Sequence, residues 1–270
     1  AGGDLGWVLP GALDPSLEMA RRNLISSYVD LGDLVAARQL VGDEGFDVSP
    51  RQLQVLLREG AWQQAGEVAY ASLAAGSVSS TIETAMNVAA IRMHARTTGD
   101  FARAQAALEE ASGVRWDEAG HAILPQDGSP LRDAAIGLAD VLLAGGQQER
   151  GRELLAKIVS LMQHEVGELG RPEFFYYRSH PIALSLHRDH DAAIAMIERS
   201  VASGLGLRDW WYYFESEPAY APLRADARFI GRWALNPSGC KFAGSTAETT
   251  PLVITDTSVA WFPGYCTIKK

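Results

Sequence analysis

The sequence is poor in cysteine: its 270 residues include only Cys240 and Cys266, and both lie near the C-terminal end. Two cysteines that bracket a small polar terminal segment favour a disulfide and therefore an oxidising, extracytoplasmic compartment. Two unpaired thiols in a cytosolic tail are the alternative, because spacing alone does not establish pairing. The cysteines therefore predict a Cys240–Cys266 bond and a periplasmic or secreted location.

Positive charge is also in short supply, since 24 Lys and Arg face 33 Asp and Glu and the formal net charge is −9. An acidic surface of this kind excludes a whole-surface nucleic-acid binder and docking on anionic membranes. No stretch approaches the roughly 20 apolar residues that a membrane-spanning helix requires. We therefore expect this chain to contact neither nucleic acid nor membrane, although a local basic groove stays open.

Motifs of catalysis are missing as well. The sequence has no Gly-x-Ser-x-Gly elbow, no phosphate-binding loop and no dinucleotide fingerprint. His164 and Glu165 lack the second histidine of the zinc-protease motif. We therefore predict no enzyme, no cofactor and no catalytic residue.

Two charged patterns have residue types that also occur in metal or acid–base sites. His187 and His190, with two aspartates beside them, have the spacing of metal ligands, but they fall at an inter-helix turn and are predicted to be solvated. Glu215 and Glu217 flank an aromatic run, but at i and i+2 they point to different helix faces, which predicts surface charge. Neither pattern predicts a metal or an acid–base site.

The sequence instead contains one recurring motif, a recurring phrase of about seven residues, in which a glycine separates two helical patterns and a small residue follows. Glycine ends a helix in the left-handed conformation at little cost, and Asp33 is placed to cap the next helix. In the fifth copy, Arg188 stands where the glycine would be. A repeated helix-turn-helix unit predicts a solenoid. The copies span residues 31–37, 59–65, 98–104, 145–151 and 187–193.

Apolar residues at three- and four-residue spacing predict five helix pairs around these turns, over 16–41, 49–74, 81–112, 130–169 and 173–203. The unequal distances between the turns indicate degenerate repeats, and an ordinary α-helical domain with chance turns is the alternative. The longer connection at 113–129 is predicted to be a loop with a strand-like piece at 121–124. The side chains expected inside include Leu17, Ala20, Leu24, Tyr28 and Leu31, then Ala37, Val41, Leu53, Leu56, Leu57, Ala65, Val68 and Ala69, then Ala85, Val88, Ala89, Ile91, Ala95, Ala104, Leu108 and Ala111, then Leu138, Leu142, Leu154, Leu155, Tyr177, Leu184, Ile194 and Ile197.

Composition changes toward the C-terminus. The aromatic runs 174–177 and 210–214 either cap the last repeat or line a ligand groove, and two short helices are predicted to follow, from Pro218 and over 225–233. From Asn236 onward, β-branched and aromatic runs predict a hairpin that needs packing or a covalent bond to be stable. The predicted organisation is an irregular segment 1–15, a helical repeat domain 16–235 and a small β-rich tail 236–270.

The repeat phrase resembles the signature of the tetratricopeptide repeat. Its best copy runs from Gly99 to Ala111, although Arg92 stands where the first helix should carry a small residue. The stretch 208–229, with a tryptophan pair, a proline, a leucine and Asp226-x-Arg228-Phe229, resembles the end of the repeat domain in bacterial winged-helix transcriptional regulators and related signalling proteins. The resemblance covers 16–233 and implies a sensory or assembly module whose DNA-binding half lies outside this chain.

In stacked helix pairs the first helices line a concave face. Arginines on that face are suited to clamp a partner's carboxylates, and solvated arginines paired with nearby acids are the alternative. The predicted fold is thus an all-α solenoid of about five degenerate helix pairs with a β-hairpin-like appendage. Counting back from each turn places these residues toward the groove: Arg22, Ser26, Gln54, Arg58, Met93, Arg96, Asp140 and Arg178.

The predicted function is a protein- or peptide-binding scaffold. An exported structural subunit, which self-assembles end to end through the solenoid and the tail, is the alternative. Because the first residue is Ala1, we expect the chain to be processed or part of a longer protein.

Overall fold

The computed structural model describes residues 18–42, 50–76, 81–125, 129–170, 179–202 and 217–226, together with short strands at 231–233, 252–254, 258–261 and 264–267. The described part is mostly helical, as predicted. Helices occur in each of the five predicted pairs: α1 (Glu18–Leu31) with α2 (Leu34–Val41), α3 (Pro50–Glu59) with α4 (Trp62–Ala74), α5 (Thr81–Thr98) with α6 (Phe101–Ser112), α7 (Ser129–Ala144) with α8 (Gln148–Gly167), and α9 (His180–Leu186) with α10 (His190–Ala202).

The turn inside each pair has a left-handed residue, as the recurring phrase predicts. Gly32, Gly60, Gly99 and Gly146 have φ angles between 70° and 90°, and Arg188 takes the same conformation at 67°. Around Arg188 the backbone bonds are those of the Gly32, Gly60 and Gly146 turns: Arg188 N–H donates to Ser185 O over 3.0 Å, and the next N–H donates to Leu184 O over 2.9 Å. This pair of bonds satisfies the last helical carbonyls. An arginine therefore forms the fifth turn despite its Cβ.

Side-chain caps strengthen three of these turns. Asp33 accepts a hydrogen bond from Ala36 N–H, and Asp100 and Asp189 accept the equivalent bonds from Arg103 and Ala192 N–H. Each cap satisfies an N–H that has no partner within its helix. The predicted capping role of Asp33 is confirmed.

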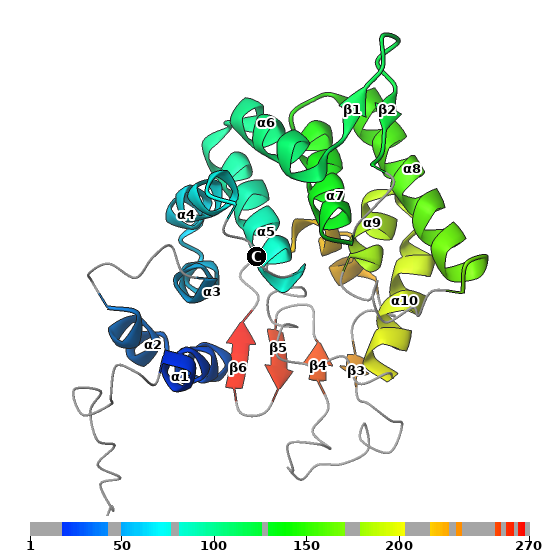
Figure 1. Cartoon of the computed structure of the whole chain (residues 1–270). Helices are drawn as coiled ribbons and strands as arrows, with labels where there is room; N and C mark the ends of the chain where they lie inside the picture. Colours follow the sequence, from blue (N-terminus) through cyan, green and yellow to red (C-terminus); the bar gives the residue numbers. More distant parts are fainter. Residues whose placement is uncertain are drawn as a thin grey trace, which may run out of the picture.

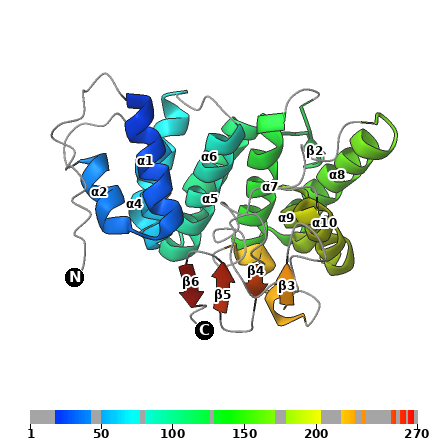
Figure 2. The ribbon, with the colours of Figure 1, turned by 90° about the horizontal axis from the view of Figure 1, so that it is seen from below.

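The helices follow one another along an arc (Figure 1). Their extensive contacts join each helix to the next or to the next but one, and α1, α3, α5, α7 and α9 contact one another in that order. Figure 1 shows α5, α7 and α9 on the inner side of the arc, with α4, α6 and α8 outside them. The view in Figure 2 shows the same succession, with the strands along one side of the helices.

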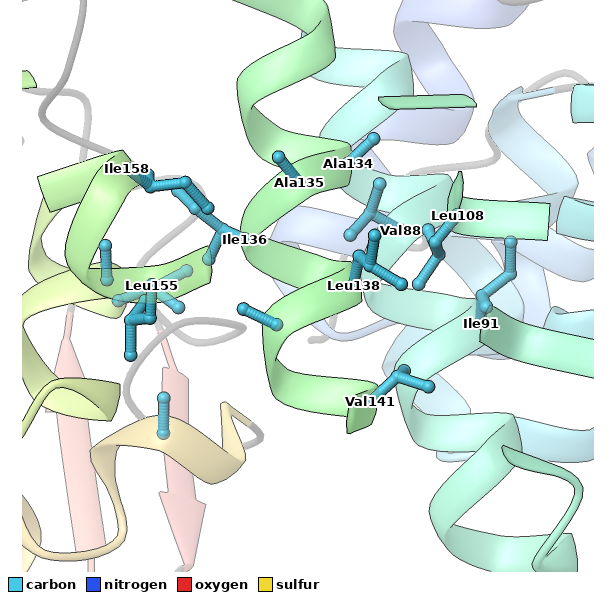
Figure 3. Packing of buried hydrophobic residues seen from close by; sticks show 14 of the residues in the cluster. Val88, Ile91, Leu108, Ala134, Ala135, Ile136, Leu138, Val141, Leu155 and Ile158 are labelled. Carbon is cyan, nitrogen blue, oxygen red and sulfur yellow. The ribbon is translucent and has the colours of Figure 1, made fainter. Parts of the chain in front are cut away.

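The core runs between the inner and outer helices. Leu108, Leu138, Leu142 and Leu154 are fully buried, and Figure 3 shows Val88 of α5, Leu108 of α6 and Leu138 of α7 gathered together. Gly137 permits this approach, because a Cβ built there would lie 2.4 Å from Cγ1 of Val88. The apolar faces predicted for α2 and α3 are buried, as are the principal predicted positions of α4 to α10, while Val68, Ala85 and Ala111 are half-buried.

The predicted face of α1 is wrong. Ala20 is exposed, and Leu24 and Tyr28 pack only partly against the core. The buried residues are Ile25 and Val29, which join a separate small cluster with α2 and with Val55 of α3. The buried stripe of α1 is thus rotated by one residue, because its partner is this small cluster at the end of the arc.

The 113–129 connection contains the predicted strand. Strand β2 (Ala122–Ile123) pairs antiparallel with β1 (Arg115–Trp116). Two side chains of α8 hold this hairpin: Glu153 accepts from Ala122 N–H, and the Lys157 ammonium donates to Ala122 O over 2.6 Å. Its bond with Lys157 is the main cause that lowers the pKa of Glu153 to about 2.

A four-stranded antiparallel sheet lies toward the C-terminus, in the order β3 (Gly231–Trp233), β4 (Leu252–Ile254), β5 (Ser258–Trp261) and β6 (Gly264–Thr267). It lies across the open side of the arc, with β6 toward α1 and β3 toward α10 (Figures 1 and 2). The prediction of a short helix over 225–233 is wrong at 231–233, where pairing with β4 makes a strand. Cys266 lies in β6, whereas Cys240, and hence the predicted disulfide, lies outside the described residues.

Candidate functional site

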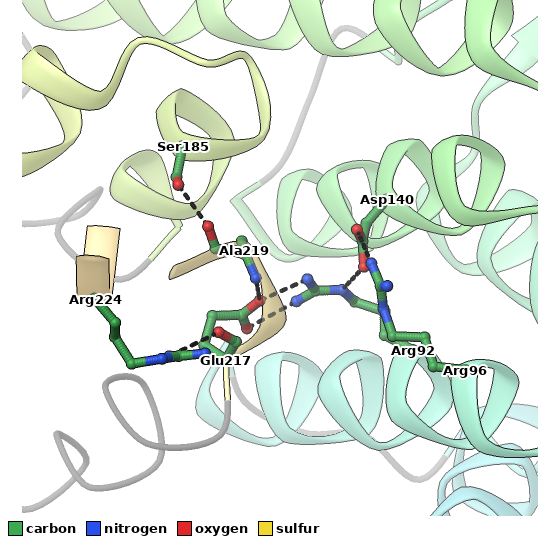
Figure 4. Close-up of polar contacts among 7 residues, drawn as sticks. All are labelled: Arg92, Arg96, Asp140, Ser185, Glu217, Ala219 and Arg224. Carbon is green, nitrogen blue, oxygen red and sulfur yellow. Dashed lines mark hydrogen bonds and ion pairs between the residues drawn. The ribbon is translucent and has the colours of Figure 1, made fainter. Parts of the chain in front are cut away.

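Arg92 is buried near the middle of α5, between the small residues Ala89 and Ala95. Figure 4 shows the Arg92 side chain extending from α5 between Asp140 and Glu217. It is only 3% exposed. A buried guanidinium requires several acceptors, because it carries five N–H donors and a fixed charge.

Two carboxylates supply those acceptors. Arg92 Nε donates to Asp140 Oδ2 on α7 over 2.8 Å, while Nη1 and Nη2 donate to the two oxygens of Glu217 over 3.0 and 2.7 Å. Arg96 Nη2 donates to the other oxygen of Asp140 over 2.5 Å. Two cations thus meet two anions in an arrangement without net charge, which is the condition under which buried charges are tolerated.

The pKa of the Asp140 carboxyl is set by burial and by its two arginine partners. Burial alone would raise the pKa of its carboxyl, but the charges of Arg92 and Arg96 and their hydrogen bonds outweigh burial and hold the pKa below the ordinary value. Asp140 therefore remains a carboxylate at neutral pH.

Glu217 belongs to a segment that is not part of any α-helix. It precedes two short 3-10 turns, η5 (Pro218–Tyr220) and η6 (Leu223–Ala225), and its carboxylate also accepts from Ala219 N–H over 2.9 Å. The buried Ser185 hydroxyl of α9 donates to Ala219 O over 2.6 Å (Figure 4). The segment thus links α5 and α9 through one side chain and one main-chain carbonyl.

A small pocket adjoins the network, between α5, α7, α9 and Glu217. Its water-accessible volume is about 30 Å³, room for one or two water molecules. Small-molecule sites usually measure hundreds of Å³. The pocket therefore marks a gap beside the docked segment and is too small for a cofactor. Its apolar lining is Ala85, Val88, Ala89, Ile136, Gly137 and Ile182.

The predicted groove residues do not form one continuous site. Arg96 joins the network with its side chain 34% exposed. Gln54 of α3 is half-buried and accepts from the Ser26 hydroxyl of α1 over 3.3 Å, so these two predicted residues bind each other. Arg22 is exposed, and Arg58 and Met93 are half-buried. Arg178 lies outside the described residues, as do the aromatic runs at 174–177 and 210–214.

Two predictions of exposure are wrong. Asp140 was expected to face the groove and is 1% exposed, because Arg92 and Arg96 of α5 enclose it. Glu217 was expected to be surface charge and is also 1% exposed, because it is the partner of a buried arginine on a distant helix. Glu215, its companion in that prediction, lies outside the described residues.

One sequence signal pointed to this site. Arg92 breaks the repeat pattern, since it stands where a small residue is expected, and a charge at a core position needs a buried partner. The sequence does not show which of its 33 acidic residues that partner is.

The residues around His187 and His190 form the fifth turn. His187, Arg188 and Asp189 are exposed and Asp189 caps α10, so the predicted solvated turn is confirmed for these residues. His190 is half-buried and is the first residue of α10. In the described ranges no group of three His, Cys, Asp or Glu side chains is placed to hold a metal ion. No helix in the same ranges is long and apolar enough to span a membrane.

A second polar cluster joins α4, α5 and α6. Arg103 donates to both oxygens of Glu67 over 2.6 and 2.8 Å, and its guanidinium lies 3.9 Å from the centre of the Tyr70 ring. The His94 ring meets the same tyrosine edge-on at 5.4 Å. Burial raises the pKa of Tyr70 to about 12, so its phenol stays protonated at neutral pH and contributes packing.

The chain matches no family model, no curated protein and no solved structure. Its resemblance to the tetratricopeptide repeat therefore stays a prediction from the residues.

Proposed function

We propose that this chain is a protein- or peptide-binding scaffold, built as a solenoid of degenerate tetratricopeptide-like helix pairs. Three features support the architecture: the five turns share a left-handed residue, the extensive helix contacts join near neighbours along the chain, and the first helices of the pairs contact one another in order. Solenoids of this type present an extended concave wall and generally act in recognition.

One observation carries the binding function. The inner wall made by α5, α7 and α9 already holds a non-α-helical segment of polypeptide, residues 217–226, which forms two short 3-10 turns. A buried forked ion pair and a buried hydroxyl-to-carbonyl bond hold this segment. A surface that holds a peptide of its own chain has the donors and the apolar seats that binding a partner requires. We further propose that the chain acts as a sensory or assembly module of a larger protein.

Site-directed photocrosslinking tests this proposal. A photoreactive benzoylphenylalanine replaces Ala85, a half-buried residue of α5 beside the pocket, and in a matched variant it replaces Ala106, an exposed residue of the outer helix α6. Both full-length variants are irradiated in the cells that produce the protein. We expect one defined polypeptide adduct from position 85 and none from position 106. Adducts from position 106 alone, or from neither position, would contradict a binding wall on the inner side.

A further inference from the structure

We propose that residues 217–226 are an internal ligand and that the wall of α5, α7 and α9 binds acidic peptide segments that share their pattern. That pattern is a carboxylate, a main-chain carbonyl two residues later, an aromatic side chain three residues later and an aliphatic one six residues later. In this chain the positions are Glu217, Ala219, Tyr220 and Leu223. The inference rests on the proposed binding function and names the chemistry of the partner.

The carboxylate position is the most specific. Arg92 presents two parallel N–H groups to both oxygens of Glu217, and Asp140 fixes the guanidinium from behind through Nε. A planar forked donor held in this way selects a carboxylate over an amide, because both acceptor oxygens are required. Asp140 and Arg96 belong to the wall itself, so the receptor for the carboxylate remains assembled when the segment leaves.

The other positions of the pattern are recognised through a main-chain hydrogen bond and through the burial of apolar side chains. Ser185 donates to the carbonyl of Ala219, a contact that any residue can satisfy because it uses the main chain. Tyr220 and Leu223 are 2% and 0% exposed and belong to the main core cluster. An aromatic and an aliphatic side chain with this spacing therefore fit the two apolar seats.

The bound shape is encoded within the segment. Tyr220 N–H donates to Glu217 O over 3.1 Å, Ala219 N–H donates to the Glu217 carboxylate, and Arg224 donates to Glu217 O over 3.2 Å. Pro218 and Pro222 restrict the backbone to the φ values that such turns need. A separate peptide with the same sequence can therefore adopt the bound conformation at a small entropic cost.

A buried ion pair is also suited to exchange. Desolvation of both charges offsets most of their attraction, so the pair specifies geometry more than it adds net affinity. A partner that brings its own carboxylate restores the same contacts, and the wall then exchanges one occupant for another without leaving a buried charge unpaired.

The experiment uses the full chain and a fluorescein-labelled synthetic peptide of residues 215–226, with a control peptide that carries Gln in place of Glu217. Two variants weaken the internal segment through different contacts and leave the wall intact, namely Glu217→Gln and Leu223→Ala. Fluorescence anisotropy measures binding of the peptide, and circular dichroism with urea unfolding verifies that each variant is folded. Light scattering measures the mass of each variant.

We expect both variants to bind the peptide at least tenfold more tightly than the wild-type chain, because a larger fraction of their walls is vacant. The Gln peptide should bind at least tenfold more weakly than the Glu peptide. Folded variants that bind no better than wild type, or that bind both peptides equally, would overturn the inference. So would loss of folding in both variants, since the segment would then be core, and so would concentration-dependent dimers, in which the occupant is a second copy.

These outcomes are separate from those of the crosslinking test. A partner captured at position 85 together with failure of the peptide assay would leave a binding wall whose ligand lacks this pattern. Tight peptide binding without a captured partner would support the carboxylate receptor and count against the scaffold function.

Discussion

Arg92 and Glu217 lie 125 residues apart in the sequence and are joined by two hydrogen bonds of 3.0 and 2.7 Å. The pair brings the C-terminal part of the chain onto the third helix pair. Arg92 departs from the predicted repeat pattern, which expects a small residue at this position, and its guanidinium holds Glu217 against α5. The consequences of the inner wall for stability can be measured without knowledge of a partner.

Removal of Asp140 should be strongly destabilising. Asp140→Ala leaves Arg92 and Arg96 with less compensating charge in a buried site, and breaking such a pair lowers the free energy of unfolding by about 3–5 kcal/mol. The control is Glu67→Ala, which breaks an ion pair whose side chains are 58% and 43% exposed and should cost about 1 kcal/mol or less. Urea unfolding followed by circular dichroism measures both values, and equal losses would mean that the network is not effectively buried.

The same carboxylate predicts an acid dependence. The pKa of Asp140 in the folded chain lies below its value in the unfolded chain, which is about 3.9. The contribution of Asp140 to stability is therefore complete above about pH 3.9 and is lost as the pH falls through the folded pKa. Between pH 5 and pH 2 the wild-type chain should therefore lose more unfolding free energy than Asp140→Asn. The comparison uses urea unfolding at each pH, and parallel curves for the two proteins would contradict the assignment.

The contact between α5 and α7 depends on Gly137. Gly137→Ala places a Cβ 2.4 Å from Cγ1 of Val88, an overlap that α5 and α7 must move to relieve, so we expect a loss of about 1–3 kcal/mol in unfolding free energy. Val88→Ala in the same chain removes the overlapping methyl groups and should recover part of that loss. Gly167→Ala at the end of α8 is the control, since a Cβ there meets nothing within 4 Å. Equal effects of the two alanines would exclude close packing as the cause.

The fifth turn offers a stabilising change. Arg188 is exposed and has φ 67°, a conformation that costs a residue with a Cβ about 1–2 kcal/mol. Arg188→Gly removes this strain but adds freedom to the unfolded chain, so we expect a net gain of about 0.5–1 kcal/mol. Arg152→Gly, on the exposed face of α8, should instead lose about 1 kcal/mol. Thermal and urea unfolding give the signs, and destabilisation by Arg188→Gly would show that the arginine side chain supports the turn.

The β1–β2 hairpin provides a local probe. With a pKa of about 2, Glu153 should keep accepting from Ala122 N–H down to strongly acidic pH. Hydrogen exchange should therefore show faster exchange at the Ala122 amide in Glu153→Gln, with the α7 amides unchanged. Direct NMR titration of the Glu153 carboxyl measures its pKa, and a midpoint near 4 would contradict the contact with Lys157.

Local patterns predicted the helices and their turns well. Glycine, aspartate and small residues act through backbone sterics and capping bonds a few residues apart, so Gly32 and Asp33 specify their turn without reference to the rest of the chain. The apolar faces of α3, α5 and α7 were predictable for the same reason. The face of α1 was not, because its packing partner lies in a small cluster that the period of α1 does not reveal.

The sequence by itself determined the alternation of helix and turn, and it contained a departure from the predicted repeat pattern, the arginine at position 92. Only the tertiary structure decided that Asp140 and Glu217 are buried and that residues 217–226, a segment of short 3-10 turns, lie against α5 and α9. Helical periodicity acts over a few residues, whereas the pairing of a buried charge depends on which distant parts of the chain meet in space. The spacing of residues within one helix therefore does not predict which distant residues pair.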